Sequence, residues 1–587
     1  MPSARPRHQK PGFLKALTLR AGSLSAGRVT WALVLLFLVW VLVDVLLLKI
    51  TGGLAQSSFD AMVRARVYAA APDPRIVIVD IDEASLLRMS KEFGRWPWPR
   101  DTLATVLDHI EKQQPAAVVW DVVFSDADRL SPGGDAAFNA AALRSQHSHF
   151  SVVRLPPQND SLSRLTRQEL PGLWLPDAGG GTAGLSQAAG AASASTVALI
   201  APVLPAVAAG RMGYNNGYVD SDGVLRRYRY AELLGDGRAI RSLALSVSGA
   251  VNPGAVHARQ RGIASTFRPV DELVAWRKAA NSYPLVPFAD VFAQADGGAP
   301  LKPVPSFAGK VVIVGATAPS LHDVHPTPLS PAQSGVDSMA TVIDNALNDR
   351  HLAELPRWLQ ALLAAALCVG IALWVRARSV ASLDPALVLL PISLLGISYL
   401  SLNGLPVFVD LSLAAGLGLI FLAALRVWNG WRRHHWTLLA DHSGDGQEGL
   451  AVEPLGVWAW HSEAPWQDAA LDRLIDAVET HAPSCRVIAP DINATWPATL
   501  HWPELAGYVA ITGPFAALES ARHGLEQAIQ KIESLGRVQS TALTVMPQPT
   551  SRDALCAQAM ADWAVLAKAA AAAVNPPASL ATQGASS

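Results

Sequence analysis

Residues 75 to 82 read Arg75-Ile-Val-Ile-Val-Asp-Ile-Asp82, a short run of β-branched residues that ends in carboxylates. Such a run predicts a strand that is buried on both faces and delivers polar groups at its carboxyl end. A helix is expected from Asp101, which stands at a probable N-cap position before apolar residues at helical spacing. Residues 116–124 predict a second buried strand, which carries Asp121.

The next segments continue this alternation of strands and helices, which indicates an α/β domain. Further strands are expected at 150–155, 196–200, 224–231 and 310–315, and helices near 238–250 and 335–348. Asp82, Asp121 and Gly315 then lie at or near carboxyl ends of strands, where open α/β sheets bind ligands. Convergent carboxylates favour a cation or a hydroxyl-rich ligand. The alternative is that Asp82 and Asp121 cap helices or accept backbone hydrogen bonds.

The composition indicates several folded units and membrane segments. A chain of 587 residues exceeds the size of one hydrophobic core. Charged residues make up 16%, against about 25% in ordinary soluble domains, and the mean hydropathy is +0.24. The net charge of −1 gives no general attraction for nucleic acid, so we expect no nucleic-acid partner. Because no cysteine precedes Cys368, no disulfide can hold the N-terminal domain together.

Four apolar runs predict a membrane topology with both termini in the cytoplasm. Residues 29–48 are long enough to cross a bilayer and follow six Lys and Arg residues with no acidic residue among them. A cleaved signal peptide is the competing interpretation. Arg376 and Arg378, and the basic residues after 425, agree with this orientation. For Asp44 and Asp384, within or beside apolar runs, we expect interfacial hydration or helix packing, with a signalling role as the alternative.

The resulting prediction is a multi-domain protein of a bacterial inner membrane. The expected segments are a basic cytoplasmic N-terminus (1–28), transmembrane helices (29–50, 357–375, 380–402 and 406–428), a periplasmic α/β domain (51–355), a small cytoplasmic α+β domain (450–573) and a disordered tail (574–587).

Three motifs in the predicted periplasmic domain resemble the type 2 CHASE extracellular sensory domain of bacterial transmembrane sensors. They are Val79-Asp-Ile-Asp-Glu-Ala-Ser-Leu86, Gly94-Arg-Trp-Pro-Trp-Pro-Arg100 and Trp120-Asp-Val-Val-Phe124. Segments at 218–227, 283–292, 309–317, 322–328 and 335–336 follow in that family's order, so the resemblance covers about residues 50–355 and the three membrane helices that commonly follow. It implies a sensory input module, which relatives couple to cyclase, kinase or diguanylate cyclase outputs. In Asp337-Ser-Met-Ala340 the family usually has a His beside the Ala, so any role of that imidazole is absent here.

The candidate ligand-binding residues are Asp82, Trp96, Trp98, Arg100, Asp121, Asp220, Asp222, Gly315 and Asp323. Trp96, Trp98 and Arg100 either form an aromatic platform with a cation above it or a rigid loop that packs on the core. His322, Asp323 and His325 lie in a loop with no regular helix to aim the imidazoles, so we expect no metal site. We also expect no catalytic residue and no cofactor. Residues 177–195, rich in Gly, Ala and Ser, predict a flexible surface insertion.

The tail predicts the βαββαβ order of a ferredoxin-like domain. Its elements are expected at 456–460, 466–480, 485–490, 507–512, 516–535 and 538–545, with a further helix over 552–573. Residues 444–449 formally match a Gly-rich phosphate loop, but no convincing strand precedes them and no helix follows. The tail lacks the set of residues that a kinase needs, its first strand carries no Asp, and it contains no Gly-Gly-Asp-Glu-Phe run.

We therefore expect a non-enzymatic signalling protein in the bilayer, a homodimer that senses an unidentified periplasmic ligand and binds an unidentified cytoplasmic protein. One alternative is a tail that acts as a divergent nucleotide cyclase. Another is a scaffold of a secretion or envelope assembly in which sensing is lost. A pocket lined only by apolar residues, or filled by loops, would favour the scaffold.

Overall fold

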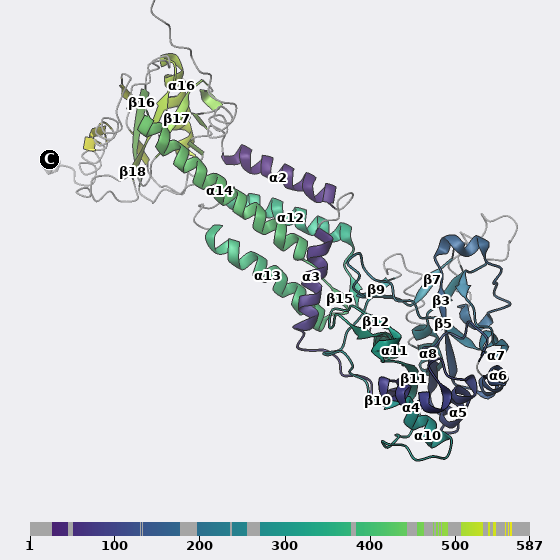
Figure 1. Ribbon diagram of the computed structural model, residues 1–587. Helices are drawn as coiled ribbons and strands as arrows, with labels where there is room; N and C mark the ends of the chain where they lie inside the picture. Colours follow the sequence, from purple (N-terminus) through teal and green to yellow (C-terminus); the bar gives the residue numbers. More distant parts are fainter. Residues whose placement is uncertain are drawn as a thin grey trace, which may run out of the picture. The chain divides into compact units, whose positions relative to one another are not determined.

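The structure of the protein is a computed structural model, drawn in Figure 1. It describes residues 26–44, 51–129, 131, 133–175, 196–234, 238–254, 271–350, 352–376 and 383–442, and, in the tail, 455–462, 484–490, 506–531, 538–540, 544–546 and a few single positions. The predictions for 1–25, 177–195, 444–449 and 574–587 lie outside these residues. The chain divides into two compact units. The α/β unit comprises Lys49–Arg357 and Gly396–Ser412, and the other unit comprises the rest.

A seven-stranded sheet forms the centre of the α/β unit. Its order is β10-β1-β11-β2-β3-β4, with β5 also paired to β3. The strands are β1 (Ile76–Ile81), β2 (Ala117–Trp120), β3 (Ser148–Arg154), β4 (Leu199–Ile200), β5 (Arg211–Tyr214), β10 (Leu285–Pro287) and β11 (Val311–Ala316). All pairs are parallel except β3 with β4. The late strand β11 therefore separates β1 from β2, and their carboxyl ends share one edge.

Helices cover both faces of this sheet, which explains why its central strands are buried along nearly their whole length. They are α4 (Glu83–Phe93), α5 (Arg100–Glu111), α6 (Gly134–Arg144), α7 (Pro205–Ala209), α8 (Leu243–Val251), α10 (Phe288–Ala295) and α11 (Gly335–Leu347). Val77 and Val79 of β1 join the core that contains α5 and α10. Ile76 and Ile78 join the second core, with α8 and α11. Alternate residues of one strand thus fill two cores, as predicted from the run at 75–82.

Several predicted element boundaries are wrong. The helix expected from an Asp101 N-cap begins at Arg100 with Pro99 at the cap, so Asp101 lies in the first turn. In the first turn, the positive end of the helix dipole stabilises an acidic side chain. The strand expected at 224–231 is two strands, β6 (Arg227–Arg229) and β7 (Ala231–Leu233), which pair with β9 (Asp271–Leu273) and β8 (Ala239–Arg241). Because β8 takes up the start of the predicted helix at 238–250, α8 begins only at Leu243.

Short elements complete the α/β unit. The hairpin of β12 (Val324–His325) and β13 (Gln333–Ser334) precedes α11, and β14 (Ala353–Glu354) pairs with β15 (Val407–Phe408). Three 3-10 helices are η2 (Pro157–Leu162), η3 (Pro171–Leu173) and η4 (Pro319–Leu321). The unit starts with a helix that the sequence did not predict, α3 (Thr51–Arg64). Phe59 of α3 packs edge-on against Phe408, with ring centroids 5.3 Å apart.

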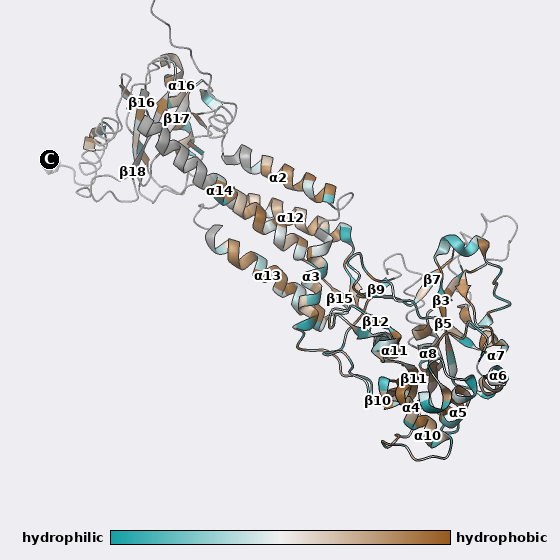
Figure 2. Ribbon diagram, viewed as in Figure 1, coloured by the Kyte–Doolittle hydropathy of each residue, from teal (hydrophilic) through white to brown (hydrophobic). Residues whose placement is uncertain are grey.

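Four apolar helices are described: α2 (Ala26–Val43), α12 (Arg357–Arg376), α13 (Leu383–Gly404) and α14 (Ser412–His442). Figure 2 shows mostly apolar residues along α12 and α13. Within the described residues, two stretches are long and apolar enough to cross a membrane, Arg357–Trp374 and Pro385–Gly404. The apolar parts of the other two, Thr30–Val43 and Ser412–Trp428, are shorter. Two of the four predicted spans therefore reach crossing length here.

The tail contains a five-stranded sheet in the order β17-β18-β16-β19, with β20 also paired to β16. Its elements are β16 (Leu455–Ser462), β17 (Arg486–Pro490), β18 (Ala506–Thr512), α16 (Phe515–Gln530), β19 (Val538–Ser540) and β20 (Thr544–Met546). All its pairs are antiparallel. Trp458 and Trp460 of β16 pack with Leu525 of α16 in its core. The last predicted strand is divided into β19 and β20, and most of the predicted helices at 466–480 and 552–573 lies outside the described residues.

Candidate functional site

A cavity of about 520 Å³ lies at the carboxyl ends of the central strands. Ile81 ends β1, Asp121 follows β2, Asn215 follows β5 and Ala316 ends β11, and all four residues line the cavity. Helix α11 supplies a further wall. Ligand pockets in proteins measure about 300–1,000 Å³ and occur at this edge of parallel sheets. The position and size of the cavity are therefore those of a small-molecule site.

Seven polar side chains line the cavity: Asp121, Asn215, Asn216, Tyr228, Asp323, His325 and Ser338. The Asn215 side-chain amide donates a hydrogen bond to Asp121 Oδ1 at 3.1 Å. His325 Nε2 lies 3.6 Å from Asp323 Oδ1. Ser338 is 5% exposed, and its Oγ has no hydrogen-bond partner among the described residues. The Tyr228 hydroxyl is buried and likewise without a partner in the part of the chain that the structure describes, so the cavity offers charge and two unused hydroxyls beside apolar side chains.

The carboxylates and the imidazole of the cavity influence one another's protonation. Burial and the nearby Asp323 carboxylate together raise the pKa of Asp121 to about 6, against the opposing effects of the hydrogen bond from Asn215 and of His325. The neighbouring Asp323 carboxylate raises the pKa of His325 above its usual value. Asp121 therefore changes charge close to neutral pH, where a ligand's charge can bias its protonation.

Gly315 shapes this site without lining the cavity. A Cβ at residue 315 would lie 2.6 Å from Val336 Cγ2 and 3.3 Å from the Asp121 Cβ. At Gly335, a Cβ would lie 2.3 Å from Asp323 Oδ1. The two glycines let the start of α11 approach β11 and let the Asp323 carboxylate rest against the helix. Gly315 is thus a packing requirement of the site.

Asp82 lies outside the cavity lining and caps a helix. Its carboxylate accepts a hydrogen bond from Ser85 N at 2.7 Å, as the N-cap of α4. This is the structural alternative that the sequence left open. The neighbouring Asp80 accepts hydrogen bonds from the Thr317 hydroxyl at 2.7 Å, so it joins β1 to the residue after β11. Burial raises the pKa of Asp80 above its usual value.

The three residues of the predicted aromatic platform lie in three different environments and do not form one site. Trp96 lines the cavity. Trp98 is buried, and its ring centroid lies 5.0 Å from those of both Trp96 and Phe288. Arg100 forms an ion pair with Asp135 and lies outside the cavity lining. The packing alternative thus holds for Trp98, while the Arg100 charge joins the start of α5 to the start of α6.

Asp220 and Asp222 belong to an ion cluster rather than to the cavity. They bind Arg226, whose buried guanidinium also pairs with Asp60 on α3; the distances are 3.1, 2.7 and 2.7 Å respectively. Burial lowers the pKa of Arg226, but hydrogen bonds with Asp222 and Asp60 outweigh it, and the pKa lies above its usual value. The cluster attaches α3 to the body of the α/β unit.

A neighbouring ion pair attaches the segment before α12 in the same way. Asp220 also accepts a hydrogen bond from Arg227, whose Nη2 lies 2.6 Å from Glu354 Oε2. Glu354 belongs to β14, three residues before α12 begins. The contiguous residues 220–227 therefore contact both segments that lead toward apolar helices.

Helix α11 presents one face to the cavity and another to a buried polar network. Gly335, Ser338, Met339 and Val342 line the cavity, at the i, i+3, i+4 and i+7 spacing of one helical face. The polar face consists of Asp337, Thr341, Asp344, Asn345 and Asn348. The sequence predicted this helix but not its polar face. The polar residues that recur in it at helical spacing were the signal that could have revealed that face.

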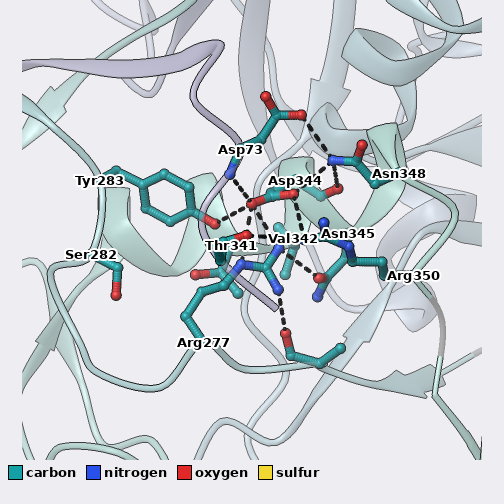
Figure 3. Close-up of polar contacts among 12 residues, drawn as sticks. Asp73, Arg277, Ser282, Tyr283, Thr341, Val342, Asp344, Asn345, Asn348 and Arg350 are labelled. Carbon is teal, nitrogen blue, oxygen red and sulfur yellow. Dashed lines mark hydrogen bonds and ion pairs between the residues drawn. The ribbon is translucent and has the colours of Figure 1, made fainter. Parts of the chain in front are cut away.

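Asp344 is the centre of that network, shown in Figure 3. It is 0% exposed and accepts hydrogen bonds from Asp73 N and Tyr283 Oη, both at 2.9 Å. Arg277 Nη2 lies 2.7 Å from its Oδ2, and Arg350 Nη1 lies 3.3 Å from its Oδ1. Asp73 lies in the segment between α3 and β1. The helix that lines the cavity therefore also holds the connection to α3.

The comparison with known families agrees with this arrangement. A family model described as the CHASE2 domain matches residues 32–375. The chain therefore belongs to the CHASE2 domain family, whose members are sensory domains of transmembrane signalling proteins, and the resemblance seen in the motifs is confirmed. No curated protein and no solved structure matches the chain.

Proposed function

We propose that this protein is a bacterial inner-membrane sensor whose periplasmic domain, residues 51–355, binds a small molecule in the cavity beside Asp121 and Asp323. The bound molecule shifts α11, and the shift reaches the membrane helices through the segments on either side of the domain. The cytoplasmic tail passes the signal on by binding another protein, and the sensor acts as a homodimer. One observation carries the proposal: α11 lines the cavity on one face and binds Asp73 through Asp344 on another.

The packing of the apolar helices supports four crossings. Phe37 of α2 packs on Phe421 of α14, with ring centroids 5.2 Å apart, in a core that also contains α12. The outward side chains are apolar as well: Leu36, Leu389 and Ile392 are each 61% exposed. A helix that is apolar all round requires an apolar surrounding, which a bilayer supplies. Residues 45–50, which continue the first apolar run, lie outside the described residues.

The cavity favours sensing over a scaffold in which sensing is lost. A scaffold predicts a pocket that is lined only by apolar groups or filled by loops. Here two carboxylates, two amides, an imidazole and two unpartnered hydroxyls line a cavity of about 520 Å³. Buried polar groups without partners destabilise a fold by about 1–3 kcal/mol each, so their presence supports a bound ligand.

The tail supports a protein-binding output. The strand order β17-β18-β16-β19 with antiparallel pairs is that of a ferredoxin-like sheet. Nucleotide cyclases with such a sheet bind metal through paired Asp residues, and the first strand here, β16, reads LGVWAWHS. In the part of the chain that the structure describes, no three His, Cys, Asp or Glu residues are grouped as metal ligands.

The test fills the cavity and measures the response at the ends of the domain. In full-length protein in lipid nanodiscs, Ser338→Trp and the milder Ala316→Leu each place apolar atoms in the cavity. Hydrogen exchange should change at residues 66–75 and 350–357. Leu143→Trp is the matched control, because Leu143 is 77% exposed on α6. Exchange that stays unchanged in both cavity variants would refute the coupling.

Two simpler measurements test the topology and the output. Reporter fusions should place residue 200 in the periplasm and the C-terminus in the cytoplasm; a cytosolic residue 200 contradicts the proposal. The purified full-length protein, incubated with ATP or GTP and Mn²⁺, should form no cyclic product. Product formation would instead establish a divergent nucleotide cyclase.

A further inference from the structure

We propose that the ligand of this cavity is a primary ammonium ion carried on an apolar body. The inference rests on the proposed sensory function and deepens it, because it names the class of molecule that is sensed.

The charge of the cavity selects a cation. Two carboxylates, Asp121 and Asp323, face one imidazole, that of His325, and none of the described lining residues is Lys or Arg. The carboxylates outnumber the imidazole even when it is protonated. An anion would meet repulsion in a site of reduced dielectric, whereas a cation would be attracted.

The hydrogen-bonding groups select a primary ammonium. Such a group has three N–H donors and no acceptor. Among the described residues, Asn215 is the only hydrogen-bond donor to the Asp121 carboxylate, which leaves acceptor capacity on that group. Ser338 Oγ, on the wall formed by α11, is buried and has no partner. The two groups can accept two of the three ammonium protons, and the partly exposed Asp323 can accept the third.

The rest of the wall excludes a bare metal ion and a sugar. No group of three metal-ligating side chains occurs among the described residues. Apolar side chains such as Ile81, Val122, Leu225, Met339 and Val342 form much of the lining. They would leave the hydroxyl groups of a sugar without partners, which is unfavourable, but they would bury a hydrocarbon or aromatic body.

Binding of this cation should depend on pH. Burial raises the pKa of Asp121 to about 6 in the empty site, and a bound ammonium favours the charged carboxylate. The other titratable groups that interact with Asp121 are Asp323, His325 and Tyr228, and burial raises the pKa of Tyr228 above its usual value, so its hydroxyl stays neutral in this pH range. Because protonated His325 repels the ligand, its deprotonation at higher pH acts in the same direction. Affinity should therefore rise between pH 5 and pH 7.

Three probes of similar shape and different charge test the proposal. Titration calorimetry on the full-length protein in nanodiscs would use 2-phenylethylammonium, 2-phenylethanol and phenylacetate. At pH 7 the ammonium should bind at least about tenfold more tightly than the alcohol, and phenylacetate should not bind. Its affinity should fall about tenfold at pH 5. Asp121→Asn and Asp323→Asn should each weaken ammonium binding about tenfold or more. Asp108→Asn, which changes an exposed carboxylate outside the cavity, should leave it unchanged.

Failure of this inference can be told apart from failure of the sensory function. No ammonium binding, alcohol binding of equal strength, or unchanged affinity in both carboxylate variants would overturn the ligand class. Asp323→Asn keeps the test valid if Asp121→Asn does not fold, because Asp323 is partly exposed. These results leave the cavity-filling experiment untouched. Conversely, ammonium binding without changed exchange at residues 66–75 and 350–357 would overturn coupling and retain the site.

Discussion

Replacing Asp344 by Ala should destabilise the α/β unit strongly. Asp344 is fully buried, and its ion partner Arg277 is 2% exposed. Removing the carboxylate leaves a buried guanidinium, which retains hydrogen bonds to Asn345 and the Ala275 carbonyl oxygen but loses its partner charge. Breaking a buried ion pair in this way costs about 3–5 kcal/mol. The loss also frees the segment around Asp73, because its amide donates to Asp344.

The expected fall in melting temperature follows from the size of the unit. The α/β unit contains roughly 300 residues, and the entropy of unfolding is about 2.1 cal/mol/K per residue. One kcal/mol then corresponds to about 1.6 °C, so Asp344→Ala should lower the melting temperature by about 5–8 °C. Tryptophan fluorescence during heating of the full-length protein in nanodiscs measures this shift.

A matched variant separates burial from the loss of an ion pair as such. Asp108 pairs with Arg144 at 2.7 Å on the surface, and exposed pairs contribute about 0–1 kcal/mol. Asp108→Ala should therefore lower the melting temperature by less than about 2 °C. The double variant Asp344→Ala with Arg277→Met should be less destabilised than the sum of the single variants, because no buried charge remains. If Asp344→Ala behaved like Asp108→Ala, the reasoning would be refuted.

Four further predictions test other parts of the unit. Arg226→Met leaves Asp60 and Asp222 without their cation, so exchange of the amides in Thr51–Arg64 should increase by about tenfold or more; unchanged exchange would contradict the role of the cluster. Gly315→Val places a Cβ 2.6 Å from Val336 Cγ2 and should cost about 1–3 kcal/mol in thermal or urea unfolding, whereas an unaltered midpoint would show that α11 can move away freely. Burial raises the pKa of Asp121 to about 6, so the protonated carboxyl group contributes up to about 3 kcal/mol of stability below about pH 4. This contribution is lost as pH rises through 6. Asp121→Asn should therefore abolish the pH dependence of the melting temperature between about pH 4 and 8. Burial lowers the pKa of His149 to about 3, so the free energy of unfolding should fall as pH falls below about 6.5. His149→Gln should remove that loss. If the stability of both proteins depended on pH in the same way, a buried neutral imidazole would be excluded.

The strands of the sheet were predictable because their cause is local. A run such as Ile76–Ile81 cannot be half-exposed without placing apolar residues in water, so burial on both faces follows from the residue order itself. The same local reasoning predicted α11, and the family motifs around Asp82 and Trp120 could be read directly in the sequence. It failed at short segments such as β8, which was predicted as the start of helix α8. Whether three residues form a strand depends on a partner strand elsewhere in the chain.

The candidate site was predictable only in part. Asp121 was correctly placed at the carboxyl end of a strand, and Asp323 was a candidate from a loop; both line the cavity. Asp220 and Asp222 were not separable from them by sequence, because a carboxylate that binds a ligand and one that binds Arg226 look alike along the chain. Which of them a guanidinium reaches is decided by tertiary contacts.

By itself, the amino-acid order determined the alternation of strands and helices, the apolar runs and the family. Tertiary structure decided that β11 lies between β1 and β2, that Ser338 faces the cavity and that Asp344 meets Asp73. The physical reason is that periodicity reports which face of an element is apolar, but not what covers that face. A shift of one residue in the pairing of Ile76 with Val311 would send every side chain of β1 to the opposite core. The contacts that build the site exist only once that register is set.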